Sequence, residues 1–361
     1  MDFDLSDDQR LLEDTVRAFL ADRLPMKRVR ALREAPCPND RGAWRELAEL
    51  GVAGVLVPEA LGGSDLGLLD AALVAWALGH AAAPAPFLGS GVMAPMALSA
   101  VGGAEAEGWL GALAEGECVF GVAATEAFSV REGAGVVFEG DGLRGKALMA
   151  VDACGADRLL VVVGGQRLAV VRSDAAGLTT TRLRSVDATR CTAELVFDGV
   201  APEALYEEAG AATARMLDAG RVALAADTLG ACESMLEQAV FYARERRQFG
   251  RPIGSFQAVK HMCAEMAAEL EPARSLLWYA AHAADALPKE APLLACHVLA
   301  HAAEIGREIA SVATQVHGGI GWTDEQNLHF WFKRIATSRH LLGGPELLRE
   351  RAARIQNLVA A

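Results

Sequence analysis

The chain is poor in aromatic residues, in blocks of positive charge and in paired cysteines. Aromatic residues make up 6% of the 361 residues, Asp and Glu outnumber Lys and Arg by 47 to 34, and no Lys/Arg-rich block occurs. Binding to nucleic acid or to an anionic membrane surface needs such a block, so neither partner is expected. The seven cysteines form no CxxC pair. That argues against a disulfide framework and a zinc site, and it is typical of a reducing compartment.

Long uninterrupted apolar runs are also missing. The stretch 66–92 is broken by Asp70, His80 and Pro84, so we expect no membrane span. The first nine residues lack a basic segment followed by an apolar one, which predicts no signal peptide and a cytoplasmic protein. His297 and His301 have the i,i+4 spacing of a helical metal site. No carboxylate motif accompanies them, and no metal site is expected.

The pattern of apolar residues changes twice along the chain and so predicts three domains. Helical periodicity covers residues 1–117, where Ser6 and Gln9 form a capping box. Short β-rich runs between Gly and Asp turns fill residues 118–205, a pattern typical of a small antiparallel barrel or sandwich. Long helical segments return over residues 206–361 and predict a four-helix bundle. The fold class is therefore α+β, mainly α.

The most informative motif lies between Tyr242 and His261, where one long helix ends and the next begins. It contains Arg246, Gln248, Phe249, Phe256 and Gln257. A guanidinium offers a planar fork of donors to a diphosphate, and a Gln amide can pair with hydroxyls or with the edge of an adenine. A solvated basic helix end is the alternative interpretation.

A second motif runs from Gln315 to Glu325. Its two successive glycines, Gly318 and Gly319, let the backbone approach a ligand closely, although a helix C-cap uses the same residues. Together the two motifs closely resemble the C-terminal domain of the acyl-CoA dehydrogenase family, flavoenzymes that desaturate acyl-CoA thioesters between Cα and Cβ. The segments 3–9 and 50–63 resemble the family too, so the resemblance spans essentially the whole chain.

The resemblance implies an FAD cofactor, an acyl-CoA substrate, an electron-transfer flavoprotein as electron acceptor and a tetrameric assembly. In the family the positions that match Arg246, Phe256 and Gln257 reach the FAD of a neighbouring subunit. The remaining cofactor-binding positions that the resemblance implies are Gln248, Phe249, Gln315, Val316, His317, Gly318, Gly319 and Thr125.

Other family positions carry unexpected residues. The family's catalytic Glu, which removes the α-proton while hydride leaves Cβ for the flavin, corresponds here to Leu342 or, in some members, to Gly220. The Trp and Thr that face the flavin ring correspond to Leu148 and Ala150, and after Thr125 and Glu126 residues 127–132 leave the family's pattern. Arg221, which in the family orients the catalytic Glu, is expected only to pair with Asp218 or another carboxylate.

Three functional hypotheses follow. In the first, the chain is a partner subunit that completes the FAD site of a separate catalytic subunit. In the second, it is a homotetrameric acyl-CoA dehydrogenase with a relocated base, for which Glu346 and Asp218 are the candidates. In the third, it binds a CoA thioester or acts as a scaffold without redox chemistry. The partner is accordingly a second dehydrogenase subunit or another copy of this chain.

Overall fold

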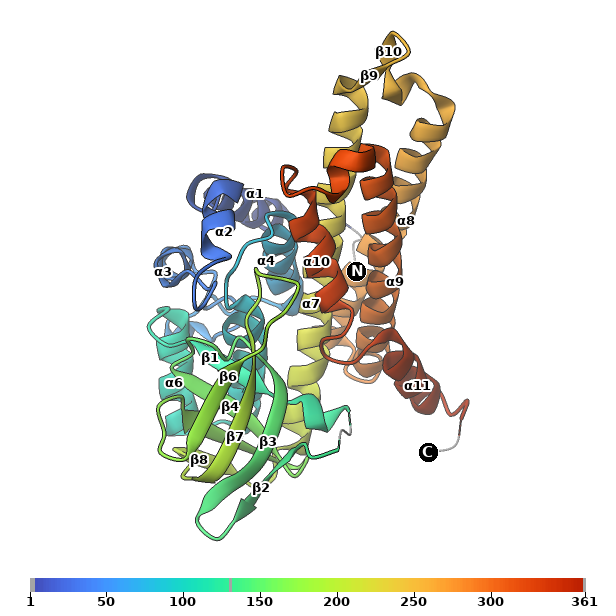
Figure 1. The fold of residues 1–361 in the computed structure, drawn as a ribbon. Coiled ribbons are helices and arrows are strands. Elements are labelled where there is room, and N and C mark those ends of the chain that lie inside the picture. The colour runs from blue at the N-terminus through green and yellow to red at the C-terminus, as the bar shows by residue number, and fades with distance from the viewer. Residues whose placement is uncertain (1–3, 130–131, 360–361) are drawn as a thin grey trace.

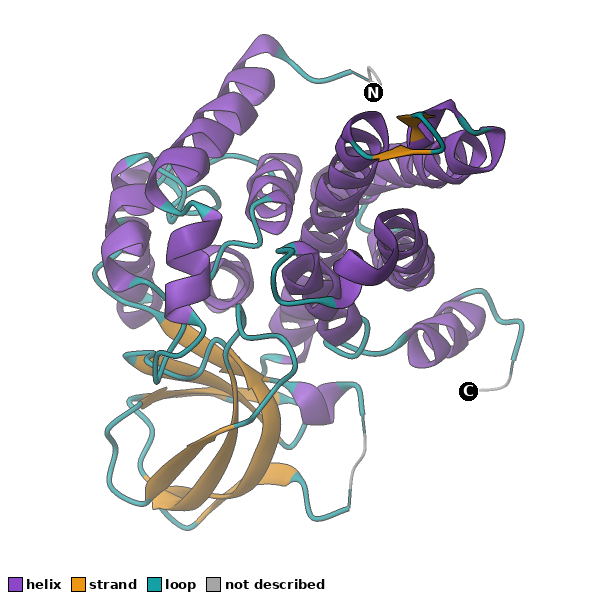
Figure 2. Ribbon diagram, turned by 45° about the horizontal axis from the view of Figure 1, so that its top comes forward, coloured by secondary structure: helices purple, strands orange, loops and turns teal. Residues whose placement is uncertain are grey.

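The computed structural model describes residues 4–129 and 132–359. Phe3, Val130 and Arg131, which belong to segments compared with the family above, lie outside the described residues. The order of helical, β and helical regions confirms the predicted fold class (Figure 1). The sheet lies to one side of the two groups of helices (Figure 2).

The N-terminal region is helical. Its capping box is confirmed, because the Ser6 hydroxyl accepts from the Gln9 amide at 3.1 Å and the Gln9 side chain accepts from the Ser6 amide at 3.0 Å. A cap that the sequence analysis missed starts α3, where Asp40 accepts from the amides of Gly42 and Ala43. The helices are α1 (Asp7–Arg23), α2 (Met26–Leu32), α3 (Arg41–Glu49), α4 (Leu68–His80), α5 (Ala94–Val101) and α6 (Ala104–Ala114), with a π-helical segment at Leu88–Met93.

The middle region forms one eight-stranded sheet in the order β6-β7-β3-β1-β4-β5-β8, with β2 paired to β3. Neighbouring strands among the described residues are antiparallel, with one departure: β1 and β4 run parallel. This pairing is possible because β3 returns antiparallel to β1 on its other side. The strands are β1 (Phe120–Ala123), β2 (Gly135–Glu139), β3 (Gly142–Val151), β4 (Arg158–Val163), β5 (Arg167–Arg172), β6 (Leu178–Arg182), β7 (Thr192–Val200) and β8 (Ala204–Tyr206).

The C-terminal region is a bundle built on long helices. The central helix α7 is rich in Ala and is buried along much of its length, so it packs against neighbours on several sides. A two-stranded hairpin of β9 (Arg247–Gln248) and β10 (Arg251–Pro252) joins α7 to α8 at the far end of the bundle from the sheet (Figure 1). The helices are α7 (Gly210–Glu245), α8 (Gln257–Ala286), α9 (Ala291–His317), α10 (Leu328–Ser338) and α11 (Pro345–Ile355). None of the described helices is long and apolar enough to cross a membrane.

A buried ionic network joins the sheet region to the bundle. Asp227 on α7 accepts from Arg334 on α10 at 2.6 and 2.9 Å and from Arg190 at 2.6 Å. Arg334 also donates to the Thr189 hydroxyl at 2.7 Å. Burial alone would raise the pKa of Asp227, but Arg190 and Arg334 outweigh it and hold that pKa below its usual range. The network therefore depends on an ionised Asp227.

Asp152, at the end of β3, is a second buried carboxyl with the opposite behaviour. It accepts from the Gly89 amide at 2.8 Å, and burial raises its pKa to about 6. A raised pKa gives stability that is complete below the unfolded pKa of about 3.9 and is lost as the pH rises through 6. We expect Asp152→Asn, which also suits the left-handed φ of +53°, to stabilise the fold at pH 7.5 by on the order of 2 kcal/mol.

Thermal unfolding of wild type and Asp152→Asn at pH 4 and pH 7.5 measures this effect. The advantage of the variant should disappear at pH 4, where the wild-type carboxyl is neutral. Asp198→Asn is the matched control, because Asp198 is exposed and pairs only with exposed Arg144. An equal advantage of Asp152→Asn at both pH values would contradict the assignment.

Candidate functional site

The first cofactor motif occupies the free end of the bundle. Arg246 caps α7, Gln248 and Phe249 lie in the hairpin that follows, and Gln257 is the first residue of α8. Arg246, Gln248, Phe249 and Gln257 are exposed, and Phe256 is half-buried. Among the residues that the structure describes, no ion pair to Arg246 is found, so no carboxylate there competes for its donors.

Phe249 is an unusual surface residue. It is 91% exposed and adopts a left-handed φ of +53°, a conformation that is costly for a bulky side chain. Its ring lies edge-to-face against Phe256 at 6.0 Å, and the Arg251 guanidinium lies 4.1 Å above the Phe256 ring. An exposed aromatic residue on a protruding hairpin is typical of a surface that another molecule covers.

The second cofactor motif lies beside the first. The His317 ring stacks on Tyr242 of α7 at 4.7 Å, which ties the end of α9 to the end of α7. Burial lowers the pKa of His317, and its Nδ1 donates to the Ala313 carbonyl at 2.8 Å. Val316 is buried, whereas Gln315 is exposed. His317 and Val316 thus fix the turn from inside, while Gln315 faces outward.

Gly318 and Gly319 complete this surface. Both are exposed, and a Cβ added at either would meet no atom within 4 Å. Gly318 has a φ of +66°, which favours glycine. Residues 246–257 and 315–319 thus form one exposed surface, which we call the motif end, with a free guanidinium and open backbone. These features fit the diphosphate of FAD.

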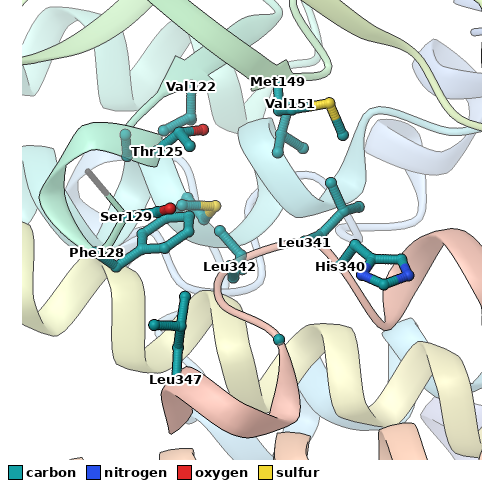
Figure 3. Close-up of a pocket in the computed structure, with 13 residues that line it drawn as sticks. Val122, Thr125, Phe128, Ser129, Met149, Val151, His340, Leu341, Leu342 and Leu347 are labelled. Atoms are coloured by element: carbon teal, nitrogen blue, oxygen red, sulfur yellow. The ribbon is translucent and has the colours of Figure 1, made fainter. Parts of the chain in front are cut away.

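Thr125 is the predicted cofactor residue that does not belong to the motif end. It lies after β1, near the sheet, and lines a cavity of about 170 Å³ between the sheet and the bundle (Figure 3). Its hydroxyl donates to the Leu148 carbonyl. We call this space the central cavity. Its lining residues are Met93, Val122, Ala124, Thr125, Phe128, Ser129, Met149, Val151, His340, Leu341, Leu342, Gly344 and Leu347.

The two family positions for the catalytic Glu meet at the wall of the central cavity. A Cβ added at Gly220 on α7 would lie 3.1 Å from Cδ1 of Leu342 and 2.9 Å from Cγ of Met93. The Leu342 side chain therefore packs directly against Gly220, although the two residues are far apart in sequence. Leu342 also has a left-handed φ of +53°. Apolar atoms fill the place where a carboxylate from either position would start.

Arg221 is buried beside this wall. Its Nη1 donates to Asp218 at 2.7 Å, and its Nε donates to the Leu342 carbonyl at 3.1 Å. The expected pairing with Asp218 is confirmed. In this chain the guanidinium supports the backbone of the loop at Leu342, since the side chain there offers no acceptor.

Neither candidate for a relocated base lines the central cavity. Asp218 is held by Arg221 and by Arg351 at 3.4 Å, and burial raises its pKa despite these cations. The Glu346 side chain is 74% exposed and pairs with Arg339 at 3.3 Å. A general base must reach the proton that it removes. Asp218 and Glu346 are instead paired with arginine side chains, and neither lines the central cavity.

The wall expected to face a flavin ring differs from the prediction. Ala150 is fully buried and pairs with Ala193 in the sheet, and Met149 lines the central cavity instead of Leu148 or Ala150. An irregularity in the register between Ala147 and Ala150 turns the strand at this point. The sequence analysis could not identify Met149 as a lining residue, because alternation along a regular strand does not apply where a bulge changes which residues face each side of the sheet.

The central cavity and the motif end therefore differ in the chemical groups that they can bind. The central cavity is smaller than the roughly 300–1,000 Å³ of typical ligand pockets, and its described lining contains no Asp, Glu, Lys or Arg. It therefore offers no charged side chain from its described lining to a ligand. Met93, Phe128 and His340 also line it and were missed, because their sequence surroundings resemble ordinary core helix and loop.

Comparison with known proteins identifies the family of the chain. A family model described as the acyl-CoA dehydrogenase N-terminal domain matches residues 6–117, and one described as the C-terminal domain matches residues 209–356. The acyl-CoA dehydrogenase IpdE2 of Mycobacterium tuberculosis is 33% identical over 95% of this chain and 96% of its own length.

Two solved structures have the same fold over almost their whole length. A variant of the Tcur3481–Tcur3483 steroid ACAD is 32% identical with a TM-score of 0.89, and 98% of each chain is covered. The ChsE4–ChsE5 complex from Mycobacterium tuberculosis is 27% identical with a TM-score of 0.91, and 100% of each chain is covered. The chain described here belongs to the acyl-CoA dehydrogenase family.

Proposed function

We propose that this chain is the partner subunit of a hetero-oligomeric acyl-CoA dehydrogenase and supplies the motif end to FAD held by a separate catalytic subunit. The observation that carries the proposal is the packing of Leu342 and Met93 around Gly220, where neither Leu342 nor Gly220 supplies a carboxylate. The packing fills the space that a carboxylate from either position would need.

The position of the motif end supports contacts in trans. The hairpin of the motif end lies at one end of the bundle, while the sheet and the region of Thr125 lie at the other (Figures 1 and 2). Arg246, at the start of the hairpin, and the central cavity, beside the sheet, thus lie toward opposite ends of the same chain. An assembly in which each motif end meets the sheet region of another subunit satisfies this geometry and implies a tetramer with dihedral or pseudo-dihedral symmetry.

The relatives suggest the kind of assembly and substrate. One similar structure is the ChsE4–ChsE5 complex, and another is a steroid ACAD named for Tcur3481 and Tcur3483. We extend both features to this chain as part of the proposal: a second dehydrogenase subunit as partner, and a bulky, steroid-derived CoA thioester as the substrate of the complex. Within the chain, the proposed domains span residues 1–117, 118–205 and 206–361. The electron acceptor would be an electron-transfer flavoprotein.

The visible spectrum of flavin tests the proposal. The chain purified alone, mixed with excess FAD and then gel-filtered, should carry essentially no flavin, because the family positions that face the flavin ring carry Leu148 and Ala150 here. The same chain co-expressed with a dehydrogenase from its gene neighbourhood should elute as a complex with bound FAD. Stoichiometric flavin on the chain alone would overturn the proposal and would favour the homotetrameric enzyme.

A further inference from the structure

Another pocket adjoins the central cavity and is lined largely by α11. It encloses about 300 Å³, which reaches the lower end of the range for ligand pockets. Phe128 and Leu347 line both spaces (Figure 3). We call it the arginine pocket, because three guanidinium groups line it. Its lining residues are Ala127, Phe128, Arg221, Gly343, Leu347, Leu348, Glu350, Arg351 and Arg354.

Arg221 brings a cation with spare donors to this pocket. Its side chain is only 1% exposed. Its Nε donates to the Leu342 carbonyl and its Nη1 donates to Asp218. Its Nη2 carries two more N–H groups, which find no acceptor among residues 4–129 and 132–359. Because a buried donor without an acceptor costs free energy, a further acceptor in the pocket would stabilise Arg221.

The charges around the arginine pocket do not balance. Arg351 lies 3.4 Å from the same Asp218 oxygen that Arg221 contacts at 2.7 Å. In the part of the chain that the structure describes, neither arginine has another carboxylate partner. Arg354 is paired with Glu350. Three guanidinium groups thus share two carboxylates, which leaves one positive charge uncompensated.

The two arginines that share Asp218 also repel each other. Burial lowers the pKa of Arg221, and although Asp218 opposes this shift, the positive charge of Arg351 adds to it. A single negative charge placed between the two guanidinium groups would cancel this repulsion. The electrostatics of the pocket therefore favour an anion.

The rest of the wall indicates which kind of anion fits. The Arg221 guanidinium lies 6.0 Å from the centre of the Phe128 ring, and Leu347 and Leu348 add aliphatic surface. An aliphatic chain would gain free energy by leaving water for this wall, whereas an inorganic anion would not. A carboxylate matches the planar fork of a guanidinium and carries the one negative charge that the pocket lacks.

We propose that the arginine pocket binds an aliphatic monocarboxylate, with its carboxylate between Arg221 and Arg351 and its chain against the apolar wall. The site needs neither FAD nor a partner subunit. Its failure would therefore leave the proposed function untouched, and failure of the proposed function would leave this site untouched.

Calorimetric titration of the full-length chain with sodium hexanoate at pH 7.5 tests the site. We expect saturable binding of one hexanoate per chain. Hexanamide, which has a similar shape but no charge, should bind at least about tenfold more weakly. Inorganic phosphate should also bind at least about tenfold more weakly, because it cannot use the apolar wall. The proposal is overturned if hexanoate shows no saturable binding, or if hexanamide or phosphate binds as tightly.

Two variants on α11 locate the site. Arg351→Ala should weaken hexanoate binding at least about tenfold, because it removes one of the two guanidinium groups. Arg349→Ala is the matched control, since Arg349 is 56% exposed on the same helix and does not line the pocket. It should leave the affinity unchanged. Equal weakening in both variants would show a general effect of charge on α11 and would overturn the proposal.

Asp218→Asn gives a change of the opposite sign. It removes the carboxylate that both guanidinium groups now share, so hexanoate should bind roughly tenfold more tightly and raise the Tm of this variant more than that of wild type. A purely structural role of Asp218 predicts no gain in affinity. Unchanged or weaker binding by folded Asp218→Asn would contradict the proposal. If this variant does not fold, Arg351→Ala still decides the question, because that side chain is 34% exposed.

Discussion

Arg246→Ala in the co-expressed complex should lose FAD while the chain stays folded. Arg246 is exposed at the end of α7 and has no carboxylate partner within residues 4–129 and 132–359, so the substitution removes no ion pair there. A guanidinium on a diphosphate forms charge-assisted, paired hydrogen bonds. We expect FAD to bind roughly a hundredfold more weakly, which corresponds to about 3 kcal/mol. Flavin absorbance of the complex after gel filtration, together with titration of FAD into the apo complex, measures the loss.

The matched control is Arg244→Ala. Arg244 is also exposed and lies in the last turn of α7, but it is not among the cofactor-binding positions that the resemblance implies. It removes the same charge from the same helix end and should leave flavin content unchanged. Equal flavin loss in both variants would show that FAD binding depends on the total positive charge at this helix end and not on a specific contact of Arg246. Full flavin content in Arg246→Ala would contradict the proposed contact in trans.

Asp227→Asn should be among the most destabilising single substitutions in this chain. The Asp227 carboxylate is shared by Arg190 and Arg334, whose side chains are 9% and 3% exposed. Asn keeps the shape but removes the charge, so the buried Arg334 guanidinium loses its counter-ion and Arg190 is left with Asp187, 3.8 Å from its Nε. Breaking a buried ion pair in this way costs about 3–5 kcal/mol. Urea unfolding followed by circular dichroism measures the change in the free energy of unfolding.

The pH dependence separates this effect from a packing defect. Because the pKa of Asp227 is lowered in the folded state, its stabilisation is present above the unfolded pKa of about 3.9 and disappears as the pH falls through the folded value. The difference between wild type and Asp227→Asn should therefore be constant from pH 7 to about pH 5 and shrink in stronger acid. Asp198→Asn, at an exposed pair, should change stability by less than about 0.5 kcal/mol. A difference that does not vary with pH would contradict the ionic account.

Local patterns explain what could be predicted from the sequence. The capping box at Ser6 and the long bundle helices depend on neighbouring residues and helical periodicity. Helices α7 and α8 lie in the predicted helical region 206–361, and the break between them falls in the segment from Tyr242 to His261. The parallel pairing of β1 with β4 was not predictable, because strand composition does not specify which strands become neighbours. The bulge beside Met149 was not predictable either, because it depends on how β3 pairs with β7.

Contacts between distant residues were beyond the sequence as well. The motif spacing identified Leu342 and Gly220 as the two family positions for the catalytic Glu. Only the fold shows that these two residues pack against each other. Likewise, Asp227 and Arg334 form a buried ion pair although they are 107 positions apart. The FAD motifs were easier to find, since each is a short continuous segment whose residues already lie together.

The packing of Leu342 on Gly220 constrains the evolution of this chain. A Glu introduced at position 220 would have its Cβ 2.9 Å from Met93 and 3.1 Å from Leu342, so it would first distort the wall. A Glu introduced at position 342 would place a carboxyl among apolar groups, at a cost of several kcal/mol if ionised. Each single step disturbs the wall before it offers a proton acceptor, so a working base needs compensating changes at the same time. The contact thus acts as an epistatic ratchet and, under the proposed function, favours a lasting division of labour between two genes over a return to a self-sufficient enzyme.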